Sequence, residues 1–133
     1  RPPNILSADF IGEAKLLPGR VSGRNGDLYI VETAMGLWLA ASAPAQELAD
    51  GQAVECIIRP ENIRTNRSGS DSNSFEAIVQ SVKLNGSTVT ATLQAGGISM
   101  HATLLNEYAV NLKPGGKSRW YASAENTVVI ART

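Results

Sequence analysis

Short runs of alternating apolar and polar residues, separated by glycine-containing turns, most constrain what this chain can fold into. Asn25-Gly26 and Asn85-Gly86 favour tight hairpins, because both residue types tolerate a positive φ. Gly96-Gly97 and Pro114-Gly115-Gly116 predict further turns. The runs between the turns predict strands with one buried face. They cover Asp27–Thr33, Ala53–Arg59, Phe75–Leu84, Thr88–Leu93, Ile98–Leu104, Ser118–Ala122 and Thr127–Ala131.

Strands this short and this closely spaced predict an all-β fold, in the form of an OB-like small barrel or sandwich. Two short helical segments are expected beside it. One covers Ala8–Lys15, and the other covers Ala43–Ala49, where good helix formers follow Pro44. With 133 residues, the chain has the size of a single domain with its own hydrophobic core.

An internal repeat predicts that this domain is built from two related half-domains. Three residues recur sixty-four positions further on, in the pairs Gly51 and Gly115, Glu61 and Glu125, and Asn62 and Asn126. We therefore predict a first half at residues 19–64 and a second half at residues 75–133. The polar stretch 65–74 is interpreted as a flexible connector, and residues 1–18 as the junction from a preceding domain.

Charge and composition disfavour a nucleic-acid partner. The twelve basic and twelve acidic residues cancel and are scattered, so the chain has no basic patch for a phosphate backbone. Its seven aromatic residues are not interleaved with basic ones, as they would be in a stand-alone OB-fold that stacks bases. No apolar run reaches the roughly 18 residues that cross a bilayer, and we expect a cytoplasmic chain.

Residues suited to catalysis or metal binding are sparse. His101 and Cys56 are the only histidine and cysteine, so one copy lacks the several N or S ligands of a zinc site. We expect His101 to face solvent from a strand and Cys56 to be a buried, inert thiol. Glu61 and Glu125 are interpreted as turn-closing acids rather than an acid–base pair. The sequence therefore predicts no catalytic, cofactor-binding or metal site, and no enzyme activity in this part of a protein.

The start of the chain carries the first of three resemblances. Arg1-Pro2-Pro3-Asn4, followed by Asp9–Gly19, resembles the junction after the nucleotide-binding domain of ABC-importer ATPases. Lys15 stands where that family usually has Asn. The Phe10-Ile11-Gly12 turn and its continuation are more similar to polyamine, ferric-iron or phosphonate importers than to sugar importers.

Two further segments resemble the same family in the correct order. Arg59–Ile63 is similar to the Arg-Pro-Glu-x-Ile segment that follows a strand in these proteins. Phe75–Val79, running into Gly86–Val89, is similar to the entry into the family's second half. The three segments together cover most of the chain and resemble the C-terminal transport-associated OB-like domain, known as the TOBE domain.

The resemblance implies an accessory domain that regulates and dimerises an importer's ATP-binding subunit without hydrolysing ATP. ATP and magnesium would bind in a missing domain. Its partners would be a second copy, the nucleotide-binding domain and, indirectly, the permease subunits, on the inner face of the cell membrane. The interface candidates are Phe10, Gly12, Arg59, Pro60 and Glu61. For Arg59, a local ion pair at a barrel corner is the other interpretation.

A second hypothesis is a small-ligand sensing β-domain. Related half-repeat domains bind small oxyanions or effectors at subunit interfaces through backbone amides and hydroxyls. Asn85, Gly86, Ser87 and Thr88 would supply such donors in one tight turn. The other interpretation of this turn is an ordinary hairpin.

Overall fold

The computed structural model describes residues 14–42, 47–67 and 72–132, and they form an all-β fold of two sheets. The first sheet is a closed barrel with the strand order β1-β2-β3-β9-β4. Its strands are β1 (Lys15–Asn25), β2 (Leu28–Thr33), β3 (Gly36–Ser42), β4 (Ala53–Ile58) and β9 (Val128–Ala131). Within the described residues, no helix has the length and apolar character needed to span a membrane.

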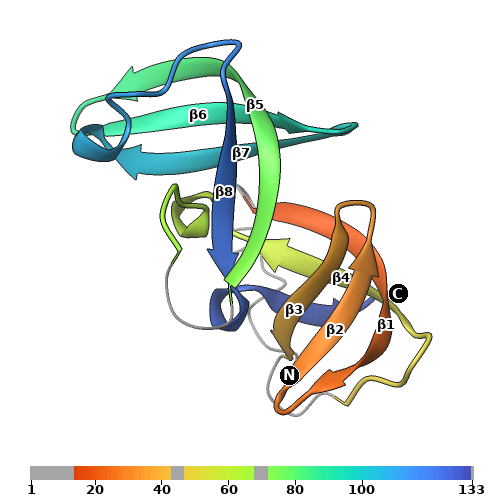
Figure 1. Cartoon of the computed structure of the whole chain (residues 1–133). Coiled ribbons are helices and arrows are strands. Elements are labelled where there is room, and N and C mark those ends of the chain that lie inside the picture. Colours follow the sequence, from red (N-terminus) through yellow and green to blue (C-terminus); the bar gives the residue numbers. More distant parts are fainter. Residues whose placement is uncertain (1–13, 43–46, 68–71, 133) are drawn as a thin grey trace.

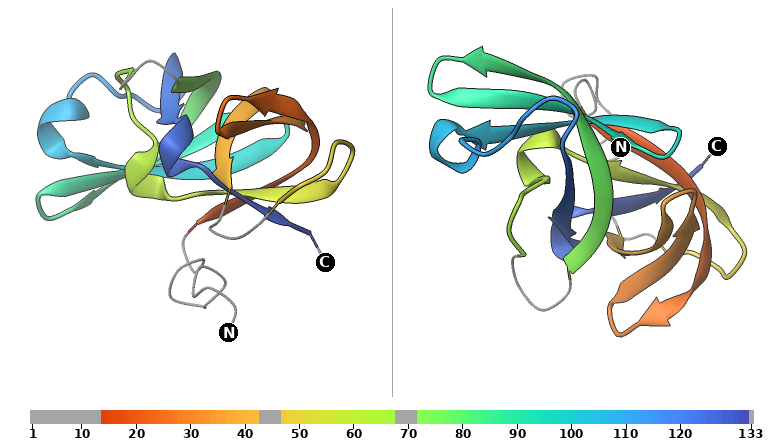
Figure 2. Two further views of the ribbon diagram at one scale, coloured as in Figure 1. Left: turned by 90° about the horizontal axis from the view of Figure 1, so that it is seen from below. Right: turned by 45° about the horizontal axis from the view of Figure 1, so that its top comes forward.

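The second sheet has four strands in the order β7-β6-β5-β8. They are β5 (Ser72–Asn85), β6 (Thr88–Ala95), β7 (Ile98–Leu105) and β8 (Lys117–Ser123). Short 3₁₀ helices follow β4, β7 and β8; they are η2 (Pro60–Asn62), η3 (Asn106–Tyr108) and η4 (Ala124–Asn126). Strands β5 and β8 run side by side from this sheet toward the barrel (Figure 1). Figure 2 shows the barrel and the sheet as two lobes of one molecule.

The structure has two related halves, as expected for the fold class, and they share one construction. In each half, the first strand is bulged and pairs with both its second and its fourth strand. Beside the bulge, the amide of Gly51 donates to the Val21 carbonyl at 2.7 Å, and the amide of Gly115 donates to the Val79 carbonyl at 2.6 Å. Both glycines have positive φ, +84° and +88°. The repeated glycine thus marks the same left-handed turn twice.

The halves also exchange the segments that follow their 3₁₀ helices. After η2, Arg64 of the first half forms an antiparallel bridge with Tyr121 in β8. After η4, β9 crosses back and pairs with β4, where Val128 faces Ile57, and with β3. The residues just before these pairings, Ile63 and Thr127, are fully buried. Each half therefore completes its structure with chain from the other.

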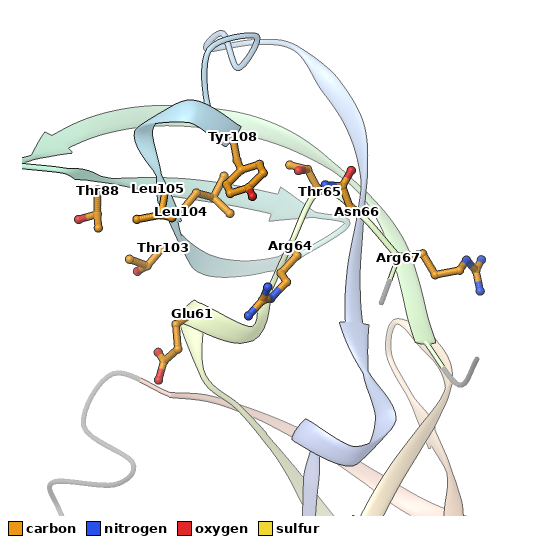
Figure 3. A pocket seen from close by; sticks show the side chains of 10 residues that line it. All are labelled: Glu61, Arg64, Thr65, Asn66, Arg67, Thr88, Thr103, Leu104, Leu105 and Tyr108. Atoms are coloured by element: carbon orange, nitrogen blue, oxygen red, sulfur yellow. The ribbon is translucent and has the colours of Figure 1, made fainter. Parts of the chain in front are cut away.

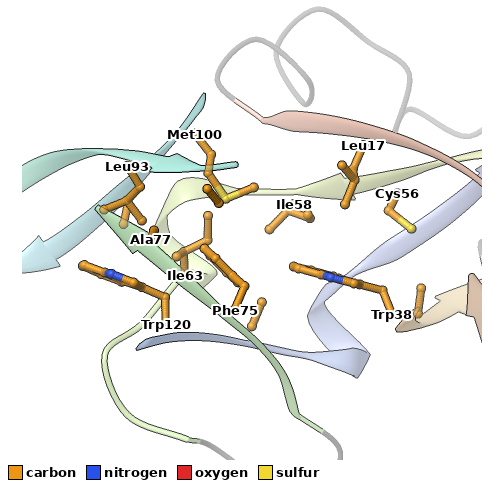
Figure 4. Packing of buried hydrophobic residues seen from close by; sticks show 14 of the residues in the cluster. Leu17, Trp38, Cys56, Ile58, Ile63, Phe75, Ala77, Leu93, Met100 and Trp120 are labelled. Atoms are coloured by element: carbon orange, nitrogen blue, oxygen red, sulfur yellow. The ribbon is translucent and has the colours of Figure 1, made fainter. Parts of the chain in front are cut away.

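One continuous hydrophobic core runs through both halves (Figure 4). Trp38 of the barrel lies against Phe75 of β5 with 5.9 Å between the ring centroids, and Trp120 fills the core of the second sheet. Cys56 is fully buried, as predicted. Burial, and secondarily the charge of Glu55, raises the pKa of the Cys56 thiol to about 12, so it stays protonated at neutral pH.

Strand β1 was not predicted, because Pro18, Gly19 and Gly23 interrupt its pattern. Gly19 is required there, since a Cβ would lie 2.6 Å from the Glu32 carbonyl oxygen on β2. Lys15, the last residue of the expected first helix, is in this strand, as are the other final residues of the expected 1–18 junction. The rest of the expected Ala8–Lys15 helix lies almost wholly outside the described residues.

The second expected helix and the connector also differ from the structure. Residues 47–49 of the expected Ala43–Ala49 helix are not helical, while residues 43–46 lie outside the described part. The Leu48 amide donates to the Tyr29 hydroxyl at 3.0 Å instead of closing a helical turn. Strand β5 begins at Ser72, because its first residues pair with β8. The last three residues of the expected 65–74 connector are therefore part of a strand. Strand β3 was also unpredicted.

Candidate functional site

A cavity of about 500 Å³ lies between the segment that follows η2 and the end of β7 with η3 (Figure 3). One wall comes from the first half and carries Glu61, Arg64 and the residues up to Arg67. The opposite wall comes from the second half and carries Thr103, Leu104, Leu105, Tyr108 and, from β6, Thr88. The cavity is thus lined by one segment from each half and has both polar and apolar surfaces.

Of the three predicted interface residues at η2, Glu61 lines the cavity, while Arg59 and Pro60 directly precede it in the chain. Arg59, the residue that precedes η2, donates through Nε to Oε2 of Glu61 at 2.9 Å. The hydrogen bond from Arg59 lowers the pKa of Glu61 below its ordinary value, against a smaller opposing effect of burial. Pro60 between them is buried. This is the local ion pair considered for Arg59, and a role for these residues at an interface stays a prediction.

Arg64 is one of two exposed arginines that line the cavity, the other being Arg67. Its backbone is fixed on both sides, because the Arg64 amide donates to the Tyr121 carbonyl and the Arg64 carbonyl accepts from the Tyr121 amide, both at 2.8 Å. Its side chain, in contrast, makes no hydrogen bond or ion pair with any residue that the structure describes. Figure 3 shows the guanidinium directed into the cavity below Tyr108. Arg67 points away from this space, and its guanidinium carbon lies 5.5 Å from the Tyr121 ring centroid.

The second wall is hydrogen-bonded to the Asn85–Thr88 turn, which the sequence predicted as a ligand site. The Asn106 amide donates to the Ser87 carbonyl at 3.0 Å, and the Asn106 side-chain amide donates to the Gly86 carbonyl at 3.3 Å. These bonds fix η3, which carries Tyr108, against the tip of the β5–β6 hairpin. Tyr108 and the preceding Leu105 are both 50% exposed, so an apolar surface faces the cavity mouth.

The turn itself has the bonding of an ordinary hairpin. Asn85 donates through Nδ2 to the Thr90 hydroxyl at 2.9 Å, and the Thr88 hydroxyl donates to the Asn85 carbonyl at 3.1 Å. Gly86 adopts a positive φ of +68°. Of Asn85, Gly86, Ser87 and Thr88, only Thr88 lines the cavity. The side-chain donors of Asn85 and Thr88 are therefore used within the turn, and oxyanion binding there stays a prediction.

The remaining candidates do not join this site. His101 is exposed on β7, as predicted, and lines a separate cavity of about 530 Å³ with Lys15 and Pro60. Phe10 and Gly12 lie outside the described residues. Among the residues that the structure describes, no three His, Cys, Asp or Glu side chains cluster as a metal site would require. Arg64 and Tyr108 were not singled out from the sequence, because their proximity arises only from the exchange between the halves.

The fold places the chain in the class of all-β, OB-like domains built from two related halves. One solved structure with this fold is the cytoplasmic molybdate-binding protein ModG, in a crystal form with molybdate bound. The two share a TM-score of 0.76 at 18% sequence identity, over 89% of this chain and 96% of ModG. At that identity the likeness establishes the fold.

The TOBE domain family matches residues 56–130. This chain belongs to the TOBE domain family, so the resemblance stated from the sequence is confirmed. The match begins within β4 and ends within β9, and it therefore includes both walls of the cavity.

Curated relatives carry the name spermidine/putrescine import ATP-binding protein PotA. The protein from Rubrobacter xylanophilus is 37% identical over 117 residues, which cover 86% of this chain and 30% of the relative. The protein from Roseobacter denitrificans is 27% identical over 121 residues, covering 88% of this chain and 33% of the relative. The chain thus spans about a third of the length of these relatives.

Proposed function

We propose that this chain is the accessory domain of the ATP-binding subunit of a polyamine-type ABC importer, and that it regulates this subunit through self-association. The observation that carries the proposal is the similarity to PotA proteins over 86% of the chain, which falls on 30% of the relative's length. ATP hydrolysis, with its magnesium, and the contact with permease subunits belong in this proposal to the rest of the subunit, at the cytoplasmic face of the membrane.

The proposed self-association surface lies at one end of the second sheet. Leu84 is 73% exposed at the end of β5, and Val110 is 74% exposed just after η3. The bonds from Asn106 to the hairpin tip bring these two elements together. Exposed aliphatic side chains that gather at one place mark interaction surfaces in soluble proteins. A second copy is the occupant expected for a subunit whose ATPase works as a dimer.

The test uses the full-length subunit that contains this chain. We expect Leu84→Asp and Val110→Asp each to weaken dimerisation at least tenfold, since each places a charge in an apolar contact. Sedimentation velocity over a concentration series measures the dissociation constant, and ATP turnover with the permease measures the regulatory consequence. Ile78→Asp is the matched control, because Ile78 is exposed on β5 away from the hairpin tip.

Two results would contradict the proposal. One is a wild-type subunit that stays monomeric under conditions in which the importer is active. The other is an equal effect of Leu84→Asp, Val110→Asp and Ile78→Asp on dimerisation, which would indicate a general loss of folding rather than a local surface. Circular dichroism of each variant separates these cases.

Binding of a small oxyanion is the second candidate function. It is favoured by the fold shared with ModG, whose structure holds molybdate. The side-chain hydrogen bonds of Asn85 and Thr88 within their own turn count against that turn as the site. Calorimetric titration with molybdate, sulfate and phosphate tests this candidate, and flat traces for all three would contradict it.

A further inference from the structure

We propose that the cavity beside Arg64 is a binding site for a small amphipathic anion, meaning a carboxylate or phosphate ester that carries an apolar body. The proposal does not depend on the proposed self-association, because it rests on the side chains that line the cavity. The volume of about 500 Å³ lies within the range of small-molecule pockets.

The charge of the site comes from Arg64. Glu61, the acidic residue of the lining, has its carboxylate bound by Arg59 at 2.9 Å, so it does not neutralise Arg64. The Arg64 guanidinium is thus left with its hydrogen-bond donors unused by the described residues. A planar guanidinium binds a carboxylate or phosphate through two parallel hydrogen bonds. This predicts an anionic group at the base of the ligand.

The apolar part of the ligand is predicted by the opposite wall. Leu104, Leu105 and the ring of Tyr108 line it, and Figure 3 shows them across the cavity from Arg64. Thr103 and the Tyr108 hydroxyl add hydrogen-bonding groups at the edge. A small inorganic anion would leave this apolar surface in contact with water. An uncharged molecule would leave the Arg64 guanidinium without an anionic partner.

The backbone of both walls is fixed before any ligand arrives. Arg64 is held by two backbone hydrogen bonds to Tyr121 and by the neighbouring Ile63, which is fully buried. Tyr108 is held by the two bonds from Asn106 to the hairpin tip. A site that is already ordered loses less conformational entropy on binding, which raises affinity.

The test titrates the chain with 4-phenylbutanoate and follows its amide resonances by NMR. The matched probes are acetate, which lacks the apolar body, and 4-phenylbutanol, which lacks the charge. We expect 4-phenylbutanoate to shift the amides of Thr103, Leu105 and Tyr108, and both matched probes to bind at least tenfold more weakly. Arg64→Gln should weaken the binding of 4-phenylbutanoate about tenfold or more, because it removes a charged hydrogen-bond partner.

Arg132→Gln is the control for general electrostatics, since Arg132 is exposed just after β9 and does not line the cavity. It should change the affinity less than twofold. Tyr108→Ala is a second site variant, and it should weaken binding without changing the net charge. Absence of shifts with 4-phenylbutanoate at millimolar concentration would overturn the proposal. So would equal binding of acetate or 4-phenylbutanol, or equal losses in Arg64→Gln and Arg132→Gln.

Discussion

The two halves of this domain have the same strand plan but end differently. In the first half, β9 pairs with both β3 and β4 and closes a barrel. In the second half, the corresponding segment contributes a single bridge from Arg64 to Tyr121, and the sheet stays open. Position 64 carries Arg, whereas its repeat equivalent, position 128, carries Val, which packs beside Ile57. The difference shows how a repeated scaffold can close a barrel at one end and leave a cavity with polar and apolar walls at the other.

The prediction with the largest expected effect tests whether the two halves unfold as one cooperative unit. Trp120→Ala should lower the free energy of unfolding by about 3–5 kcal/mol, because it removes a fully buried aromatic side chain. Urea unfolding followed by circular dichroism measures this loss. Since the core is continuous, NMR signals of Val31 in the barrel and of Leu93 in the second sheet should disappear in one transition. A barrel that stays folded after the second sheet has unfolded would contradict the shared core.

A second prediction tests whether the repeated turns are equivalent. Gly51→Ala and Gly115→Ala should each destabilise the domain by about 1–2 kcal/mol, because an L residue is strained at a φ near +85°. Thermal and urea unfolding of the two variants measure the effect. Gly97→Ala is the control, since Gly97 has neither a left-handed φ nor a close neighbour, and it should stay within about 0.5 kcal/mol. A clear loss in only one of the two turn variants would show that the turns are not equivalent.

The third prediction uses a difference between equivalent core positions. Cys56 in the first half corresponds to Trp120 in the second, and only Cys56 can ionise. Its pKa of about 12 in the folded state lies above the ordinary value of 9.0, so the unfolded state loses the proton first as pH rises. Stability should therefore fall between about pH 9 and pH 12, by at most about 1.4 kcal/mol per pH unit.

Unfolding by urea across this pH range, with Cys56→Ala for comparison, measures that slope. The variant should show a smaller decline, because it has no thiol at this position. The same burial predicts that iodoacetamide modifies Cys56 only when the chain is unfolded. Rapid modification of the folded chain at pH 8 would contradict a buried, protonated thiol.

The smallest expected effect concerns the two equivalent acids. Glu61→Gln should cost no more than about 0.5 kcal/mol, because the Glu61 side chain is 54% exposed and its bond to Arg59 is screened by solvent. Glu125→Gln should have no measurable effect, since Glu125 has no ion pair within the described residues. Because Arg59 lowers the pKa of Glu61, the contribution of the pair is lost as pH falls through that lowered value. Equal effects of the two variants in urea unfolding would contradict this difference.

The sequence predicted the parts of this fold that depend on local patterns. The hairpins at Gly26 and Gly86 and the strand runs around them follow from alternation and turn chemistry, which act over a few residues. Strand β1 was missed, because Gly19 is selected by its close approach to β2 and not by strand propensity. The cavity was missed for a similar reason, since Arg64 and Tyr108 meet only after the halves exchange their segments.

The most direct test of the central claim is the sequence of the reading frame upstream of the codon for Arg1. If this chain is the accessory domain of an importer ATPase, that frame encodes a Gly-x4-Gly-Lys-Ser/Thr loop followed by a Leu-Ser-Gly-Gly-Gln signature. A start codon immediately before Arg1, or an unrelated upstream domain, would contradict the claim and favour an independent ligand-binding protein.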